Sequence, residues 1–186
     1  MSHDRIEGKA SLGFLLLFVI YFLAVGYYEF KDIGAFGKPL MLASTILGLY
    51  EYGTYTEKKI GSVRFMLVSI IVYIIQFFAF LKFQNKHFYT PYGVLFFIMS
   101  ACLILKFFSF LAEPVVVEKL FKFADLCVCS VFCFLFFYSN LLSANLNRDS
   151  MMIRCLGIIV GIFVASVHTI TFGTGTYREP SVARRR

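Results

Sequence analysis

Long runs of apolar residues, separated by short polar segments, dominate the pattern of the chain. A helix that crosses the ~30 Å hydrocarbon layer of a bilayer needs about 20 mostly apolar residues. Runs of this length recur along the sequence, at Leu12–Phe30, Val63–Leu81, Tyr92–Leu111, Phe123–Ala144 and Ile153–Gly173. The pattern predicts an all-α fold, a polytopic bundle of transmembrane helices with five or six spans.

The run Ile33–Tyr50 decides between five spans and six. It is apolar apart from Lys38, but two glycines and Pro39 interrupt its start. Proline is tolerated in a first helical turn, where its missing N–H has no partner to lose. We therefore expect a span that begins near Gly37, with a re-entrant segment as the alternative.

The first run also has features of a cleaved signal peptide. Basic residues precede it, and the small residues at positions 24–26 offer a cleavage site. However, the run stays apolar through Phe30, and Asp4 and Glu7 add acidic charge to its leader. Both features favour a helix that stays in the mature protein.

Composition supports a membrane protein. The chain of 186 residues is 59% hydrophobic, 19% aromatic and only 16% charged, with a mean hydropathy of +0.77. A soluble domain keeps roughly a quarter of its residues charged to cover its surface. Soluble enzymes, disordered tails and disulfide-rich secreted domains are therefore excluded.

The net charge of +7 indicates topology rather than nucleic-acid binding, because most Lys and Arg residues lie between the apolar runs. With six spans, the two tails and the segments 51–64 and 112–122 share one side, which holds eleven basic residues against six on the other. The excess predicts cytosolic termini, most firmly the C-terminus, whose side does not depend on the second run. The organisation expected is an N-terminal tail with one or two apolar helices (1–57), a four-span bundle (58–179) and a basic cytosolic tail (180–186).

Small residues recur at every fourth position of the last run. The stripe consists of Gly157, Gly161, Ala165, Thr169 and Gly173. Such spacing lets another helix approach closely. The stripe predicts a helix-packing face, either between copies or partners in the membrane or within the monomer.

Three ionisable residues inside apolar runs are candidates for function, because an unpaired charge in a bilayer is unfavourable. Asp125 lies about a turn inside its run, with Lys122 one turn away and Lys106 in the preceding run, which predicts a structural ion pair or a hydrated carboxylate at the interface. His168 is expected to hydrogen-bond Ser166, Thr169 or a backbone carbonyl, and a proton relay with Asp125 is the alternative.

Other chemistry is sparse. The cysteines Cys102, Cys127, Cys129, Cys133 and Cys155 lie in or beside apolar runs and are expected to pack as small hydrophobes, with palmitoylation an alternative for Cys127 or Cys155. Three histidines are too few for a haem pair or a di-iron cluster, and no phosphate-binding loop, Cys-x-x-Cys or GxSxG motif occurs. We expect no cofactor, no metal and no enzymatic activity.

Features at the ends of the last four runs match a known layout. A basic lead at 58–64 precedes the first, Pro91-Tyr92-Gly93-Val94 opens the second, and Lys122-Phe-Ala-Asp125-Leu126 opens the third. Arg154 precedes the Gly-rich fourth, which leads to Tyr177-Arg178-Glu179. Over residues 58–179 this layout resembles the MARVEL family of four-span proteins, which includes synaptophysin, plasmolipin and the chemokine-like factors.

The resemblance implies a four-span bundle, here preceded by an N-terminal hairpin that a plain MARVEL protein lacks. It also implies a protein of vesicle or junction membranes that organises lipid domains or the trafficking of a partner, without catalysis. We expect membrane lipids and a protein partner or a second copy as its contacts, in a vesicle, endomembrane or plasma membrane.

Three alternatives remain. The chain could be an accessory subunit of a larger membrane complex, or a small transporter or channel in which Asp125, Lys106 and His168 line a polar route. A lipid-modifying enzyme would need a cluster of His, Asp and Glu on the cytosolic face, and the acidic residues there are too sparse for one.

Overall fold

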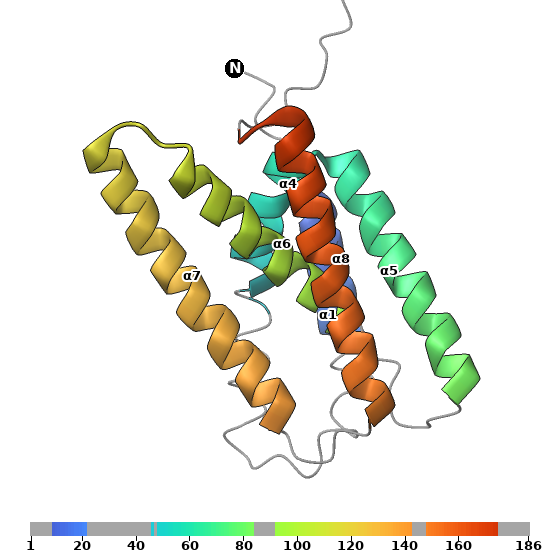
Figure 1. The fold of residues 1–186 in the computed structure, drawn as a ribbon. Helices are drawn as coiled ribbons and strands as arrows, with labels where there is room; N and C mark the ends of the chain where they lie inside the picture. The colour runs from blue at the N-terminus through green and yellow to red at the C-terminus, as the bar shows by residue number, and fades with distance from the viewer. Residues whose placement is uncertain (1–8, 22–45, 47, 84–91, 143–147, 175–186) are drawn as a thin grey trace, which may run out of the picture.

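The computed structural model describes residues 9–21, 46, 48–83, 92–142 and 148–174. Every regular element in this part of the chain is helical (Figure 1). The elements are α1 (Lys9–Tyr21), the π-helical turn η2 (Gly48–Gly53), α4 (Thr54–Ile60), α5 (Ser62–Phe83), α6 (Tyr92–Leu111), α7 (Val116–Leu142) and α8 (Arg148–Phe172). The all-α prediction is confirmed.

Helix α6 forms the centre of the bundle. Its residues from Val94 to Cys102 are almost completely buried, and Phe96, Phe97 and Met99 are among the largest buried side chains of the core. Helix α8 packs along one side of α6 and α7 along another, while η2, α4 and α5 also contact it. An apolar run that is buried all round is expected for a helix in this position.

Three helical segments are long and apolar enough to cross a membrane: Gly93–Leu111, Val116–Phe137 and Cys155–Phe172. A fourth is added if Gly48–Ile60 and Ser62–Phe78, which meet at a 117° bend, form one broken span or a re-entrant loop. The bend lies at Gly61, whose φ of +93° favours glycine.

The predicted five or six spans are therefore not confirmed. The first expected span, Leu12–Phe30, lies within the described residues only as far as Tyr21, where it forms α1. The run Ile33–Tyr50 is described only at Ile46 and from Gly48 onward. The basic tail 180–186 lies outside the described residues.

Two segments expected to be loops are helical. Residues 51–64 form the end of η2, all of α4 and the start of α5, and α7 begins at Val116 rather than Phe123. Hydropathy marks only the apolar part of a helix, whereas residues such as Glu118, Lys119 and Lys122 have good helix propensity and extend it outward. Asp125 consequently lies nine residues into α7 instead of about one turn.

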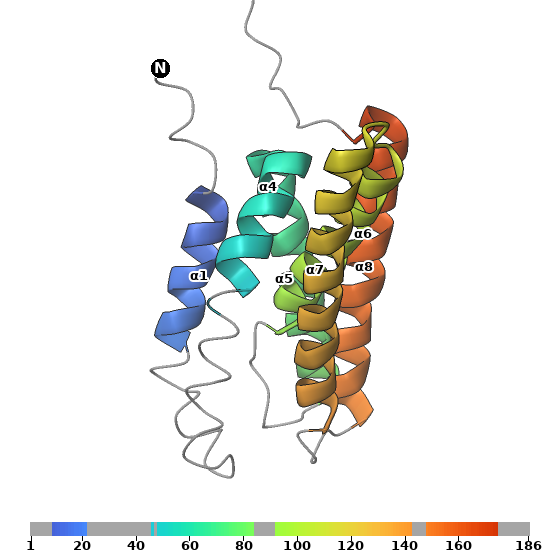
Figure 2. The same ribbon diagram turned by 90° about the vertical axis from the view of Figure 1, so that its left-hand side faces the viewer.

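Helix α1 packs against the bundle, beside η2 and α4 (Figure 2). Ser11 is buried in this contact, and its Cβ lies close to Gly53, where an added methyl group would be only 3.1 Å away. The contact gives α1 a structural role in the fold.

Candidate functional site: the seam between α6 and α7

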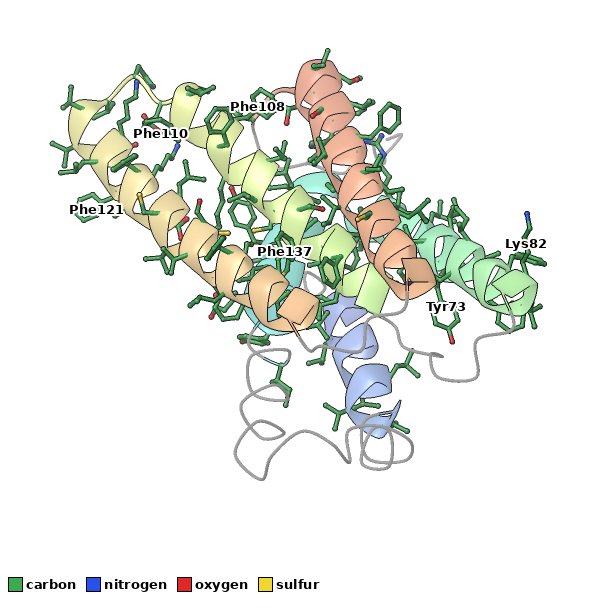
Figure 3. The ribbon with its side chains drawn as sticks, turned by 60° about the horizontal axis from the view of Figure 1, so that its bottom comes forward. Tyr73, Lys82, Phe108, Phe110, Phe121 and Phe137 are labelled. Atoms are coloured by element: carbon green, nitrogen blue, oxygen red, sulfur yellow. The ribbon has the colours of Figure 1, made fainter. Side chains whose placement is uncertain are left out.

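Helices α6 and α7 form an antiparallel hairpin whose facing side chains meet in regular register. From the connecting turn downward, the pairs are Phe110 with Phe123, Lys106 with Asp125, Cys102 with Cys129, Met99 with Cys133 and Phe96 with Phe137. In Figure 3, Phe137 points from α7 towards α6, whereas Phe121 points away from the bundle. We call this row the α6–α7 seam.

The structure brings Lys106 and Asp125 together as an ion pair. Lys106 Nζ donates to both carboxylate oxygens of Asp125 at 2.5 Å. The Lys106 side chain is 10% exposed and that of Asp125 56% exposed. The ammonium also lies 4.9 Å from the ring centroid of Tyr55 and 5.8 Å from that of Tyr52, distances at which cation–π attraction operates. This is the structural ion pair that the sequence predicts.

The thiols of Cys102, Cys129 and Cys133 converge one turn further along the seam. Cys102 and Cys129 are fully buried, and Cys133 is 2% exposed. Cys133 Sγ lies 3.9 Å from the carbonyl oxygen of Met99 on α6. Among the described residues, no group of three or more His, Cys, Asp or Glu side chains is arranged to hold a metal ion.

His168 lies apart from the seam, on α8 near the start of α5. Its ring packs obliquely on that of Phe172, with centroids 5.3 Å apart, and the Arg64 guanidinium lies over the same Phe172 ring, 4.4 Å from its centroid. Neither ring nitrogen of His168 has a hydrogen-bond partner among the described residues. The predicted bond to Ser166, Thr169 or a carbonyl is therefore wrong, because Thr169 Oγ1 donates to the carbonyl of Ala165 and the imidazole packs against an aromatic ring.

The proton relay between His168 and Asp125 is not formed in the structure. Asp125 faces Lys106 across the α6–α7 seam, whereas the charged groups near His168 are Arg64 and Lys59. The three ionisable candidates thus do not line one route through the bundle.

The small-residue stripe lies against α6 for part of its length. A Cβ at Gly157 would overlap the carbonyl oxygen of Gly93, and one at Gly161 would overlap Ser100 Oγ and come within 2.5 Å of the carbonyl oxygen of Phe97. Ala165 is fully buried. These positions pack within the monomer, the second of the two expectations for the stripe.

The stripe loses this contact towards its end. Thr169 is only partly buried, and Gly173 has open space around the position of a Cβ. With a φ of +74°, Gly173 ends α8 in the left-handed conformation that glycine adopts readily. Gly173 therefore terminates the helix and makes no close packing contact with the described residues, and its role in a contact between molecules stays a prediction.

Glu57, which no pattern in the sequence singles out, is a buried acid that joins three helices. Its side chain is 1% exposed and accepts hydrogen bonds from the backbone N–H groups of Ala10 (3.3 Å) and Ser11 (2.9 Å) and from Ser62 Oγ (2.7 Å). The carboxylate thereby joins α1, α4 and α5. The only signal in the sequence is an acidic residue between apolar runs, which is usually solvated.

A second acid, Glu113, joins the two helices at the turn of the hairpin. It accepts hydrogen bonds from Lys122 Nζ and, at 3.3 Å, from the backbone N–H of Val115. The bond from the Lys122 ammonium is the main reason that the pKa of the Glu113 carboxyl lies below its usual value. The Glu113 carboxylate therefore stays ionised at neutral pH, and its bond to Lys122 closes the end of the seam.

Comparisons with protein-family profiles, with curated proteins and with solved structures found no significant match to this chain.

Proposed function

We propose that the chain is a non-catalytic integral membrane protein that organises membrane or vesicle domains, or serves membrane trafficking, in the manner of a MARVEL-like protein. Its termini lie in the cytosol, and it resides in a vesicle, endomembrane or plasma membrane. The observation that carries the proposal is the outer face of α7, which is apolar, broad and left uncovered by the rest of the described chain.

The outer face of α7 is exposed over most of the helix. Its large apolar side chains are between 57% and 81% exposed, at Val116, Val117, Leu120, Phe121, Val128, Val131, Phe134 and Leu135. Water does not tolerate such a continuous apolar surface, whereas lipid tails do. We call these residues the α7 outer face and expect it to contact lipid and, in an assembly, a neighbouring helix.

The charged residues near the seam support a structural role over catalysis. Lys106 is paired with Asp125, Lys122 with Glu113, and Glu57 binds the first turn of α1. Each of these charges is engaged in joining helices. A catalytic carboxylate or lysine needs a free face towards a substrate.

An accessory subunit is the second candidate, and the same α7 outer face favours it. Because α7 packs chiefly against α6, its opposite side is open to a helix of another protein. The two candidates differ in what covers this face. In a membrane organiser it is covered by lipid and further copies of the chain, whereas in an accessory subunit it is covered by a stoichiometric partner.

The experiment is affinity purification of C-terminally tagged protein in mild detergent, followed by light scattering and mass spectrometry. The test variant is Leu120→Ala with Phe121→Ala, at 68% and 72% exposure on α7. The matched control is Ile71→Ala with Phe78→Ala, at 53% and 63% exposure on α5.

The organiser proposal expects a homo-oligomer that the α7 variant loses and the α5 control keeps. A stoichiometric partner lost in the same way assigns the accessory-subunit role instead. A lone monomer in all three proteins contradicts both. Solute flux into proteoliposomes that disappears with Asp125→Asn and His168→Ala would also overturn the proposal, in favour of a transporter or channel.

A further inference from the structure

Three basic residues flank the bend between α4 and α5, away from the α7 outer face. Lys58 and Lys59 lie in the last turn of α4, and Arg64 lies in the first turn of α5. The chain turns between them at Gly61, where the two helices meet at 117°. We call Lys58, Lys59 and Arg64 the α4–α5 elbow.

Two contacts bring the elbow to the end of α8. Lys59 Nζ donates to the carbonyl oxygen of Thr174 at 2.6 Å, and the Arg64 guanidinium lies 4.4 Å from the centroid of the Phe172 ring. Because these two partners are only two residues apart, the contacts hold both cations at the same end of α8. Figure 1 shows α4, the start of α5 and the end of α8 together at one end of the molecule.

The contacts of the elbow position its charges without neutralising them. A carbonyl group and an aromatic ring carry no net charge, so Lys59 keeps its positive charge beside Thr174. Lys58 is exposed. The acid next to it in sequence, Glu57, is only 1% exposed and accepts hydrogen bonds from α1. This carboxylate therefore faces the interior, while the elbow carries positive charge at the surface.

The end of α8 also sets the depth of the elbow in a bilayer. The apolar segment Cys155–Phe172 ends at the ring that Arg64 covers, and Gly173 terminates the helix directly afterwards. A span ends where hydrocarbon gives way to lipid headgroups, and long basic side chains near helix ends extend to that level. Lys59 and Arg64 therefore lie at the level of lipid phosphate groups.

The part of α5 that follows the elbow offers an apolar surface. Four side chains on one face of its first turns are 42% to 65% exposed: Val63, Met66, Leu67 and Ile70. Positive charge at headgroup level with apolar side chains beneath it matches the order of charge and acyl chain in a phospholipid.

We propose that the α4–α5 elbow binds the headgroup of an anionic phospholipid, with the acyl chains along the apolar face of α5. The inference rests on the proposed function, which places the chain in a membrane with a cytosolic C-terminus, and it names the class of lipid that such a protein gathers. The end of α8 leads to this terminus, so the elbow faces the cytosolic leaflet, where anionic lipids are concentrated.

The test uses the full chain in nanodiscs made from equal parts of phosphatidylcholine and phosphatidylserine. Native mass spectrometry after gentle release from the disc gives the ratio of the two lipids that stay bound. The test variant is Lys58→Gln with Arg64→Gln, which leaves the bond of Lys59 in place. A second variant, Lys58→Arg with Arg64→Lys, keeps both charges.

The matched control removes the same amount of charge elsewhere. It is Lys82→Gln with Lys119→Gln. Lys82 lies at the far end of α5 (Figure 3), and Lys119 lies in the first turns of α7 beside Glu118. Thermal unfolding of each protein in mild detergent identifies any variant that does not fold.

We expect the wild-type protein, the charge-keeping variant and the control to retain phosphatidylserine in preference to phosphatidylcholine. A basic residue near the membrane surface strengthens binding to anionic lipid about fivefold, so the preference of the test variant should fall about 25-fold. An unchanged preference in the folded test variant would overturn the proposal. An equal fall in the control would overturn it too, because net charge rather than the elbow would then attract the lipid.

Purification of the same proteins from native membranes tests the other occupant of such a surface. Loss of an acidic protein from the test variant, with its lipid preference unchanged, would assign the elbow to a protein partner and overturn the proposal. Leu120→Ala with Phe121→Ala, the variant of the α7 outer face, should keep its phosphatidylserine. Failure of this proposal and failure of the proposed function are thereby observed in different variants.

Discussion

The Glu57 carboxylate accepts a hydrogen bond from the backbone N–H of Ser11, which lies 46 residues earlier in the chain, in the first turn of α1. The N–H groups of a first helical turn have no partners within the helix. A carboxylate placed there satisfies these donors and interacts favourably with the positive end of the helix dipole. Because Ser62 donates to the same carboxylate, one side chain fixes the relative positions of α1, α4 and α5.

Replacing Glu57 should loosen α1. In Glu57→Ala the three donors lose their acceptor inside a buried site, and we expect a loss of about 2–4 kcal/mol in the free energy of unfolding. Glu57→Gln keeps an accepting oxygen and should lose about half as much. Thermal unfolding in mild detergent measures both. Glu51→Ala, at an exposed acid of η2, is the control and should change little; an equal loss there would contradict the role of Glu57.

For the Lys106–Asp125 pair we predict that the effects of the two substitutions on the free energy of unfolding are not additive. Asp125→Leu leaves the Lys106 ammonium, 10% exposed, without its counter-ion and should cost about 1–3 kcal/mol, whereas Lys106→Met should cost less because the Asp125 carboxylate it leaves is 56% exposed. The double variant leaves no charge and should be more stable than either single variant. Thermal unfolding of the three proteins completes the cycle. Additive losses would show that the two charges act independently.

Sequence could indicate two lysines as partners of Asp125 but gave no sign of the partners of Glu57. Asp125 stands out because it is an acid inside an apolar run, with Lys122 one turn away and Lys106 in the preceding run, and the structure selects Lys106. Glu57 lies in a polar segment, where charge is ordinary. Its partners are backbone N–H groups of α1, which sequence does not distinguish from any other helix start.

At the scale of elements, the contact between α8 and α6 depends on two glycines. We expect Gly161→Ala and Gly157→Ala each to lose about 1–3 kcal/mol, because the added methyl group meets backbone atoms of α6 that cannot turn aside. Gly13→Ala on α1 is the matched control: nothing lies within 4 Å of its Cβ position, and alanine has better helix propensity, so stability should rise by up to about 1 kcal/mol.

Thermal unfolding in detergent separates these outcomes, and sizing shows whether the stripe also joins copies of the chain. Unchanged stability of Gly161→Ala would mean that α8 does not pack on α6 through this residue. A change in oligomer size without a change in stability would restore the stripe as an interface between molecules.

The apolar runs predict elements well and their ends poorly. The run Tyr92–Leu111 coincides with α6, since both of its ends are also the ends of the helix. The run from Phe123 misses the first seven residues of α7, and residues 51–64 read as a loop although they contain α4. Hydropathy reports which residues favour lipid, whereas helix ends follow from backbone hydrogen bonds and from contacts such as that of Glu113 with Lys122.

The molecule as a whole is asymmetric about α6. On one side α8 packs closely on small residues, and on the other α7 meets α6 through larger side chains, an ion pair and thiols. Close backbone approach favours a permanent contact, because nothing at that interface can rearrange. The α6–α7 seam instead depends in part on the Lys106–Asp125 ion pair, whose strength depends on charge, so we expect the contact of α7 with the bundle to be more sensitive to conditions than that of α8.

The place of α1 in this molecule predicts that the helix is retained in the mature protein. Cleavage near residues 24–26 would leave Glu57 with only Ser62 among its three donors and would uncover Gly53. Intact-mass analysis of the purified protein should therefore show a chain that includes α1. A chain that begins near Tyr27 would contradict the prediction. As a control for stability, a protein expressed without residues 1–21 should unfold at a lower temperature than the full chain, because the buried Glu57 carboxylate then lacks the α1 donors.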